Sequence, residues 1–448
     1  MLAALALTGA TAAYLGFVLH FGVNVPFKDE WSSVKLYQDL LRGRLSLGAL
    51  WALHNENRIF FPNLLMLLLD RASRFNTVVE MVVSAVLLLA AVAGCAYVLL
   101  RTAPRRGIWF LAALVIPLSW LQSATALQGY AVALYLVLLC LALALVALFH
   151  APARSWLFSL AVAAAVVASF SSAQGLAVWP AGLVFLVARE QPRRRCWWWV
   201  ACGCGAALLY LLGFSWSGSG GGASWAVAHP LATAKFLVQL LGAVLPVSRR
   251  LMVTGTVQEV VGLALWLLAL GLFCYWLRNR SHRGWLSLPL ALVAFGAVID
   301  VLITLGRAHT AALNGAGSSR YIAFNLWMLL GLATGYGLLL GRAHGRRLIA
   351  GMAVVAVLCA FQVALSYHSG LLLGASTHRL RERAASLVTS YCRAPRSEVV
   401  SLVDPDYGAF RQLAPMLQHH RLSVFADQPP AAVTASGACG SGARAPSN

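Results

Sequence analysis

The chain has 448 residues, of which 60% are hydrophobic and only 11% are charged, and its mean hydropathy is +0.76. This composition excludes an ordinary soluble globular protein, a disordered chain and a secreted disulfide scaffold. Lys and Arg number 34 against 14 Asp and Glu, which gives a formal charge of +20. We therefore expect a polytopic membrane protein with a strong basic excess.

The basic residues fall in short clusters between apolar runs, not on one amphipathic face or in an extended tail. Clusters of this kind orient membrane helices and contact anionic lipid head groups. A nucleic-acid-binding surface would instead gather its basic residues on one face. The expected partners therefore include membrane lipids and exclude nucleic acid.

A membrane helix needs about 20 mostly apolar residues to cross roughly 30 Å of hydrocarbon. The sequence has eleven such runs, so we predict an all-α bundle of about eleven transmembrane spans. The polar, Gly-containing stretch 171–175, followed by Trp179-Pro180, predicts a tight turn between two of them. The predicted spans are 2–22, 77–100, 107–122, 129–149, 155–171, 175–188, 196–214, 259–277, 284–304, 321–341 and 348–366.

The Arg clusters set the predicted orientation of these spans. If the spans alternate, all clusters lie on one side, which the positive-inside rule assigns to the cytoplasm, with the N-terminus inside and the C-terminus outside. The apolar segment 236–247 would reverse this scheme if it crossed, so we expect an interfacial or re-entrant helix there. The clusters are Arg101/Arg105/Arg106, Arg154, Arg189/Arg193/Arg194/Arg195, Arg278/Arg280/Arg283 and Arg342/Arg346/Arg347.

Three regions are predicted along the chain. The loop between the first two spans is too long for a simple connection, and its helical apolar spacing predicts an ordered, functional segment. The regions are a transmembrane domain over 1–366 with an external loop at 23–76, a small external C-terminal segment over 367–430, and a disordered tail over 431–448.

The first span and the external cysteines bear on the compartment. No Lys or Arg precedes Lys28, and no convincing small-residue cleavage site follows the first apolar run, so we expect a membrane helix and not a cleaved signal peptide. Cys392 and Cys439 lie in the predicted external part, where an oxidising compartment permits a disulfide between them.

The acid pair Asp29-Glu30, which precedes Trp31 shortly after the first span, is the first candidate site. A carboxylate in apolar surroundings at the membrane surface has a raised pKa and can act as a general base on a lipid-borne substrate. A solvated charge pair at the start of a helix explains the local sequence equally well.

The densest polar cluster of the chain runs from His54 through Glu56 to Arg58, ahead of Phe60-Phe61. An imidazole, a carboxylate and a guanidinium together can bind a phosphate and orient a hydroxyl group. A polar surface turn before a hydrophobic segment is the alternative interpretation.

Arg320 and Tyr321 follow a run of small residues at the outer mouth of a predicted span, and Arg307 lies on the same side. Arg binds phosphate through a charged bidentate fork, and small residues let a ligand approach the backbone. The alternative is an interfacial Arg beside a Tyr of the aromatic belt. Two external Arg residues oppose the positive-inside trend, which favours a functional reason for them.

Acids inside membrane helices are costly and indicate proton or ion paths. Only Asp300 lies well inside a predicted span, and no inverted repeat is visible, which argues against a secondary transporter. A lipid-linked-glycan flippase or another transporter, with Asp300 and external Arg residues along its path, nevertheless stays open as the alternative function.

These motifs resemble the GT-C class of membrane glycosyltransferases, which use polyprenyl-phosphate-linked sugars. The resemblance covers most of residues 1–366: a first span, an acid pair in a long external loop, many further spans and an external C-terminal segment. Four short motifs look like a set found in bacterial multi-spanning proteins of that class: Asp29-Glu30-Trp31, His54-x-Glu56-x-Arg58-x-x-Phe61-Pro62, Ser172-x-x-Gly175-x-x-x-Trp179-Pro180 and Ser318-Ser319-Arg320-Tyr321.

The resemblance implies an inverting sugar transfer at the outer face of a bacterial inner membrane, from a polyprenyl-phosphate-linked sugar to a glycan or lipid-linked acceptor. It implies Asp29 as the general base, with Glu30 as the second choice, and Arg58 and Arg320 as ligands of the lipid phosphate, with Arg307 and Tyr321 beside them. His54 and Glu56 would bind substrate hydroxyls.

The chain departs from better-known members of the class because it has no large soluble C-terminal domain, which favours a lipid-linked or glycan acceptor. No cofactor is certain. A divalent metal stays open, because Asp29, Glu30, His54 and Glu56 are suitable ligands. A ligase or polymerase of surface glycans that works without a carboxylate base is a further alternative.

Overall fold

The computed structural model describes residues 2–103, 105–214, 222–245, 254–279, 284–310, 317–341 and 346–427. Within these residues the secondary structure is almost entirely helical, and the strands form one antiparallel pair, β1 (Leu53–His54) and β2 (Asn57–Arg58). The all-α prediction is therefore confirmed. The predicted tail 431–448, and Cys439 within it, lie outside the described residues.

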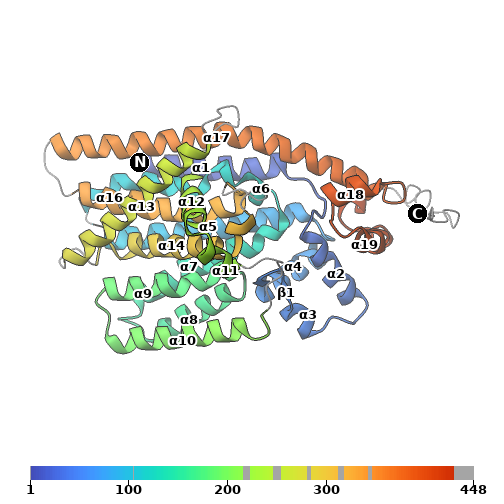
Figure 1. Ribbon diagram of the computed structural model, residues 1–448, viewed down its shortest axis with the longest axis horizontal. Helices are drawn as coiled ribbons and strands as arrows, with labels where there is room; N and C mark the ends of the chain where they lie inside the picture. The colour runs from blue at the N-terminus through green and yellow to red at the C-terminus, as the bar shows by residue number, and fades with distance from the viewer. Residues whose placement is uncertain are drawn as a thin grey trace.

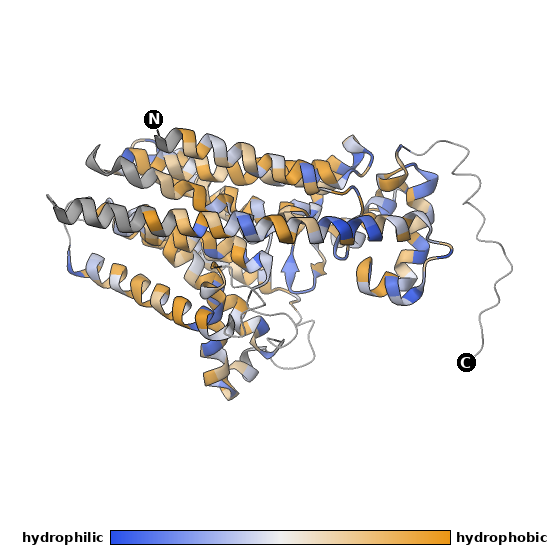
Figure 2. Cartoon of the chain, turned by 90° about the horizontal axis from the view of Figure 1, so that it is seen from above, coloured by the Kyte–Doolittle hydropathy of each residue, from blue (hydrophilic) through white to orange (hydrophobic). Residues whose placement is uncertain are grey.

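The long helices run roughly side by side in one bundle, and the short elements of the first loop gather at one end of it (Figure 1). Apolar residues dominate the length of the bundle, whereas hydrophilic residues are frequent at the end that carries these short elements (Figure 2). The bundle contains α1 (Leu2–Phe21), α5 (Thr77–Thr102), α7 (Val132–His150), α8 (Trp156–Ser169), α9 (Val178–Ala188), α10 (Arg193–Leu211), α13 (Thr254–Arg278), α14 (Ser287–Arg307), α16 (Ser319–Leu340) and α17 (Arg346–Thr389).

Shorter helices connect the long ones. They are η1 (Arg105–Leu118), η2 (Trp120–Gln122), α6 (Ser123–Ala126), η3 (Gly129–Ala131), η4 (Ala173–Ala177), α11 (Gly222–Ala228), α12 (Pro230–Gly242) and η6 (Ala308–Thr310).

Five helices in the described part of the chain are long and apolar enough to cross a membrane, against the eleven spans expected. Other expected spans coincide with helices of 10 to 17 described residues, such as those at 156–169 and 173–188. The five long helices support a membrane protein, and they are Thr77–Thr102, Gly129–His150, Gly255–Arg278, Ser287–Arg307 and Ser319–Leu340.

Three local features can be compared with the sequence prediction. The run at 107–122 forms the 3-10 segments η1 and η2 and not an α-helix; Pro117 inside it cannot donate a backbone hydrogen bond. The predicted break at 171–175 is present, because α8 ends at Ser169 and η4 begins at Ala173. The helix α12 has 13 residues, which is too short to cross the hydrocarbon.

The C-terminal segment begins inside a helix. The helix α17 runs for 44 residues, from Arg346 to Thr389, across the boundary expected at residue 366. Its last part, with α18 (Arg396–Leu402), α19 (Tyr407–His419) and η7 (Ser423–Phe425), packs on the first loop. That loop contains α2 (Glu30–Leu41), α3 (Leu47–Trp51), the strand pair and α4 (Phe60–Ser73).

The loop and the C-terminal segment share a hydrophobic core that is separate from the bundle core. Trp31 of α2 packs against Phe410 of α19, with ring centroids 5.3 Å apart. Tyr37 packs against Phe75 in the same core, at 5.7 Å. Cys392, which lies between α17 and α18, is disulfide-bonded.

Several Arg residues meet at the end of the bundle opposite the loop. The guanidinium of Arg195 donates to the carbonyl of Ala151 at 3.0 Å, and Arg189 lies 4.4 Å from the ring centroid of Phe149. Arg101 lies over Tyr97, whose hydroxyl contacts His150 at 2.7 Å. Since α5 and α7 start near the loop and end here, Arg residues from two of the predicted clusters lie at the same end of the bundle.

Candidate functional site

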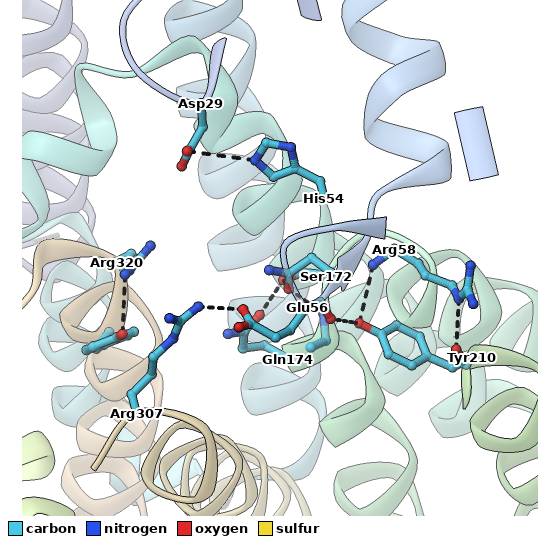
Figure 3. Close-up of polar contacts among 12 residues, drawn as sticks. Asp29, His54, Glu56, Arg58, Ser172, Gln174, Tyr210, Arg307 and Arg320 are labelled. Carbon is cyan, nitrogen blue, oxygen red and sulfur yellow. Dashed lines mark hydrogen bonds and ion pairs between the residues drawn. The ribbon is translucent and has the colours of Figure 1, made fainter. Parts of the chain in front are cut away.

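A cavity of about 400 Å³ lies at the loop end of the bundle. It is built from the start of α2, the strand pair, the starts of α7 and α16, the turn after α8 and the ends of α10 and α14, so that segments far apart in sequence converge (Figure 3). Its polar lining consists of Asp29, His54, Asn55, Glu56, Asn57, Thr125, Gln128, Tyr130, Ser172, Gln174, Tyr210, Arg307, Arg320 and Tyr321.

Asp29 is the residue before α2, and its side chain lines this cavity. Its Oδ1 atom lies 3.8 Å from Nε2 of His54, and its side chain is 43% exposed. The interaction with His54 lowers the pKa of Asp29, partial burial opposes this effect, and the positive charges of Arg320 and Lys28 add to it. Asp29 is therefore a carboxylate at neutral pH and faces both solvent and the cavity, so the raised pKa expected from the sequence is wrong for Asp29 because its interaction with His54, together with the nearby cations, outweighs its partial burial.

Glu30 points away from the cavity and is 1% exposed. Its Oε2 accepts the backbone N–H of Phe27 at 2.8 Å, and its Oε1 accepts that of Tyr130 at 3.4 Å. Burial raises the pKa of Glu30, while the charge of Arg381 lowers it. The two adjacent acids thus differ in environment: Asp29 faces the cavity, whereas Glu30 connects its loop to the start of α7.

Arg58 does not offer its guanidinium to the cavity. Its Nε donates to the carbonyl of Tyr210 at 2.8 Å, its Nη1 to that of Trp51 at 3.0 Å, and its Nη2 to that of Leu212. The carbonyls of Tyr210 and Leu212 lie at the C-terminal end of α10, where helix carbonyls lack intrahelical partners and the helix dipole is negative. Arg58 therefore caps α10 and anchors the strand pair, and its expected role as a phosphate ligand has no support in this arrangement.

Asn57 and Glu56 hold the strand pair against the other walls. Oδ1 of Asn57 accepts the hydroxyl of Ser172 at 3.1 Å and the N–H of Ala173 at 3.0 Å, so two of the motifs singled out in the sequence are in contact. Glu56 forms an ion pair with Arg307 at the end of α14. Arg307, placed against the positive-inside trend, thus has an acidic partner on the same side.

Arg320 lies at the second residue of α16, exposed at the cavity. Its guanidinium carbon lies 5.1 Å from the ring centroid of Tyr321, which is buried. The start of α16 is fixed by Ser319, whose hydroxyl accepts the N–H of Thr125 at 3.0 Å and donates to the Thr125 hydroxyl at 3.0 Å. Arg320 and Asp29 therefore face the same space from different walls (Figure 3).

The donor set for a divalent metal is sparse. Asp29 and His54 are the nearest pair of suitable ligands, Glu30 is turned away, and Glu56 is paired with Arg307. In the ranges that the structure describes, no group of three or more His, Cys, Asp or Glu side chains could hold a metal ion. We therefore assign no chemical step to a metal.

The sequence analysis did not identify Tyr130, Tyr210 and Thr125, which also line the cavity. The ring of Tyr130 lies 5.2 Å from that of His54, and the hydroxyl of Tyr210 donates to the carbonyl of Glu56 at 2.7 Å. Thr125 fixes the start of α16. In the sequence, Gln128, a polar residue between apolar runs, lies close to Thr125 and Tyr130.

Comparison of the chain with protein-family models, with curated proteins and with solved structures gave no match.

Proposed function

We propose that this chain is an integral-membrane glycosyltransferase that transfers a sugar from a polyprenyl-phosphate donor to a glycan or lipid-linked acceptor. The observation that carries the proposal is one cavity, at the loop end of an apolar bundle, whose lining brings the carboxylate Asp29 and the cation Arg320 together. The motif resemblance to the GT-C class supports the same activity and gives the donor class.

The proposed reaction assigns one role to each of these two groups. Asp29 accepts the proton of an acceptor hydroxyl, whose oxygen forms a bond to the anomeric carbon as the bond from that carbon to the phosphate oxygen breaks. The electron pair leaves with the polyprenyl phosphate, and the Arg320 guanidinium stabilises the developing negative charge. Attack from the side opposite the leaving group inverts the anomeric centre.

Other polar residues would orient the substrates. His54 holds Asp29 in the ionised form that a base requires, as the lowered pKa of Asp29 indicates. The Glu56–Arg307 pair, Gln128 and Tyr130 line the same space and offer partners for sugar hydroxyls. Tyr321, beside Arg320, completes the proposed phosphate site.

The proposed location is the bacterial inner membrane, with the cavity facing the periplasm or exterior. The Arg residues at the opposite end of the bundle support this orientation, since basic residues favour the cytoplasmic side.

A transporter is the weaker candidate, because Asp300 is fully buried and is not part of the cavity lining.

Native mass spectrometry of the purified protein with polyprenyl phosphate and with a polyprenyl-phosphate-linked hexose tests the donor site. We expect stoichiometric binding to the wild type and to Asp29→Asn, and loss of binding in Arg320→Ala. The matched control is Arg44→Ala. It removes an exposed Arg of the first loop, at the same end of the bundle but outside the cavity lining, and should bind normally.

Absence of binding to every form, including the wild type, would overturn the proposed donor and bring the transporter forward. Binding that Arg320→Ala leaves unchanged would refute the phosphate site at the start of α16. Sugar transfer that survives in Asp29→Asn would instead favour a ligase or polymerase that works without a carboxylate base.

A further inference from the structure

The turn that carries Asp29 is held by the C-terminal segment from the far end of the sequence. Lys28, the residue before Asp29, has a φ of 52°, a left-handed conformation that L-residues rarely adopt. Its backbone N–H donates to the carbonyl of Val403 at 2.6 Å. A strained turn of this kind persists only when its surroundings hold it, and here one of its partners lies about 375 residues later in the chain.

A second contact joins the same turn to α17. Arg381 is 1% exposed, and its guanidinium carbon lies 4.7 Å from the ring centroid of Phe27. Glu30, also 1% exposed, binds the N–H of Phe27 and that of Tyr130. The residues that flank Asp29 on both sides are thus fixed between α17, α18 and the start of α7.

The charges in this buried region favour a specific role for Arg381. Three acids, Glu30, Asp70 and Glu80, lie there, each at most 2% exposed. The carboxyl groups of Glu30 and Asp70 interact, and Arg381 is a cation whose charge acts on Glu30. A buried carboxylate without a compensating charge is strongly unfavourable, so removal of Arg381 would drive Glu30 to change its protonation or its position.

We propose that Arg381 is a positioning residue of the site: through Glu30 and Phe27 it holds the turn at residues 27–30 so that Asp29 faces the cavity. The C-terminal segment is then an integral part of the site and not a separate appendage. This inference rests on the proposed function for the role of Asp29, but the geometry that it describes can be tested without any enzymatic activity.

The test measures how accessible position 29 is to a membrane-impermeant maleimide. Asp29→Cys is labelled in the background of wild-type Arg381, of Arg381→Met and of the charge-balanced pair Glu30→Gln/Arg381→Met. We expect the labelling rate to rise about tenfold in Arg381→Met, because the turn opens more often when a buried anchor is lost, and to fall back toward wild type in the charge-balanced pair.

Two controls separate positioning from general damage. Arg379→Met removes an exposed charge two residues away on the same helix and should leave the labelling of position 29 unchanged. A cysteine in place of Arg42, at the other end of α2, reports on unfolding of the whole loop and should be labelled equally in every background.

Equal labelling of position 29 in wild type and Arg381→Met, or a rise that the charge-balanced pair does not reduce, would overturn the proposal. Should Arg381→Met fail to yield folded protein, Arg381→Lys carries the test: it must be labelled faster than Arg379→Met, and adding Glu30→Gln to it must reduce the labelling rate, for the proposal to stand. Failure of the wild type to bind polyprenyl phosphate would count against the proposed function alone.

Discussion

At the scale of single residues, the two acids Asp29 and Glu30 have different tasks although they are neighbours in sequence. Asp29 is half-exposed in the cavity, and its pKa is lowered by His54. Glu30 is buried and bound by two backbone N–H groups. Adjacent residues at the start of a helix point in directions about 100° apart, so one can face a cavity while the other faces the core.

Asp29→Asn is expected to lower the rate of sugar transfer by about 10²- to 10⁴-fold, the usual contribution of a general base. Transfer from a polyprenyl-phosphate-linked sugar to the acceptors of isolated membranes measures this change. Asp39→Asn, on the same helix α2 but outside the cavity lining, is the control and should retain activity. A full rate in Asp29→Asn would remove Asp29 from the mechanism.

Arg58→Met is expected to cost about 3 kcal/mol of stability, because three backbone carbonyls lose a charged donor in a largely buried site. Arg58→Lys should recover only part of this, since an ammonium cannot reproduce the planar fork. The thermal midpoint of unfolding in detergent measures the effect. Unchanged stability in Arg58→Met would show that the cap on α10 contributes little.

At the scale of elements, close packing between helices depends on the absence of a side chain at Gly175. A Cβ atom built there would lie 1.8 Å from the carbonyl oxygen of Ala168, a backbone atom at the end of α8. The turn between α8 and α9 that carries Ser172 toward the cavity therefore requires glycine. This turn is also where Asn57 joins the strand pair to the bundle.

Gly175→Ala is expected to destabilise the protein by about 2 kcal/mol or more, because backbone has to shift to remove the clash. Gly205→Ala is the matched control: nothing lies within 4 Å of its Cβ position on α10, so the change should be neutral or slightly stabilising. Thermal unfolding compares the two variants. Equal midpoints for both would show that the turn can relax without cost.

At the scale of the whole molecule, a buried acid of the loop affects how stability varies with pH. Burial raises the pKa of Asp70 on α4 from 3.8 to about 8; the neighbouring Glu80 side chain opposes this shift, and the negative charge of Glu30 adds to it. A raised pKa in the folded state means that folding favours the protonated acid. The stability that this group contributes is therefore present near pH 4 and is lost as the pH rises toward 8.

The wild type is thus expected to unfold at a lower temperature at pH 8 than at pH 5, and Asp70→Asn should reduce this difference by a few degrees. Asp39→Asn changes a half-buried acid of the same loop and should leave the pH dependence as it is in the wild type. A pH profile that Asp70→Asn does not alter would refute the assignment to this carboxyl.

The orientation of the bundle can be tested with cysteines placed at its two ends. A cysteine replacing Arg42 should react with an impermeant maleimide in intact cells, whereas one replacing Arg154 should react only after permeabilisation. Positions 42 and 154 lie in the loop region and before α8, at opposite ends of the bundle. The reverse pattern would place the cavity in the cytoplasm and contradict the proposed location.

Much of the architecture follows from the sequence alone. Apolar runs of helical length indicate an all-α membrane protein, because backbone groups in hydrocarbon must pair with one another and a helix pairs them within a single run. The polar stretch 171–175 marks a break that the structure contains. The sequence also singled out Asp29, His54, Glu56 and Arg320, all of which line the cavity.

Only the tertiary structure decides what each of these residues does. It turns Glu30 into the core, uses Arg58 to cap α10, pairs Arg307 with Glu56, and places Arg381 beside Phe27. These partners are separated by up to hundreds of residues, so no local pattern reports them. Composition and periodicity are properties of short segments, whereas the charge state and direction of a side chain depend on groups that folding brings into contact.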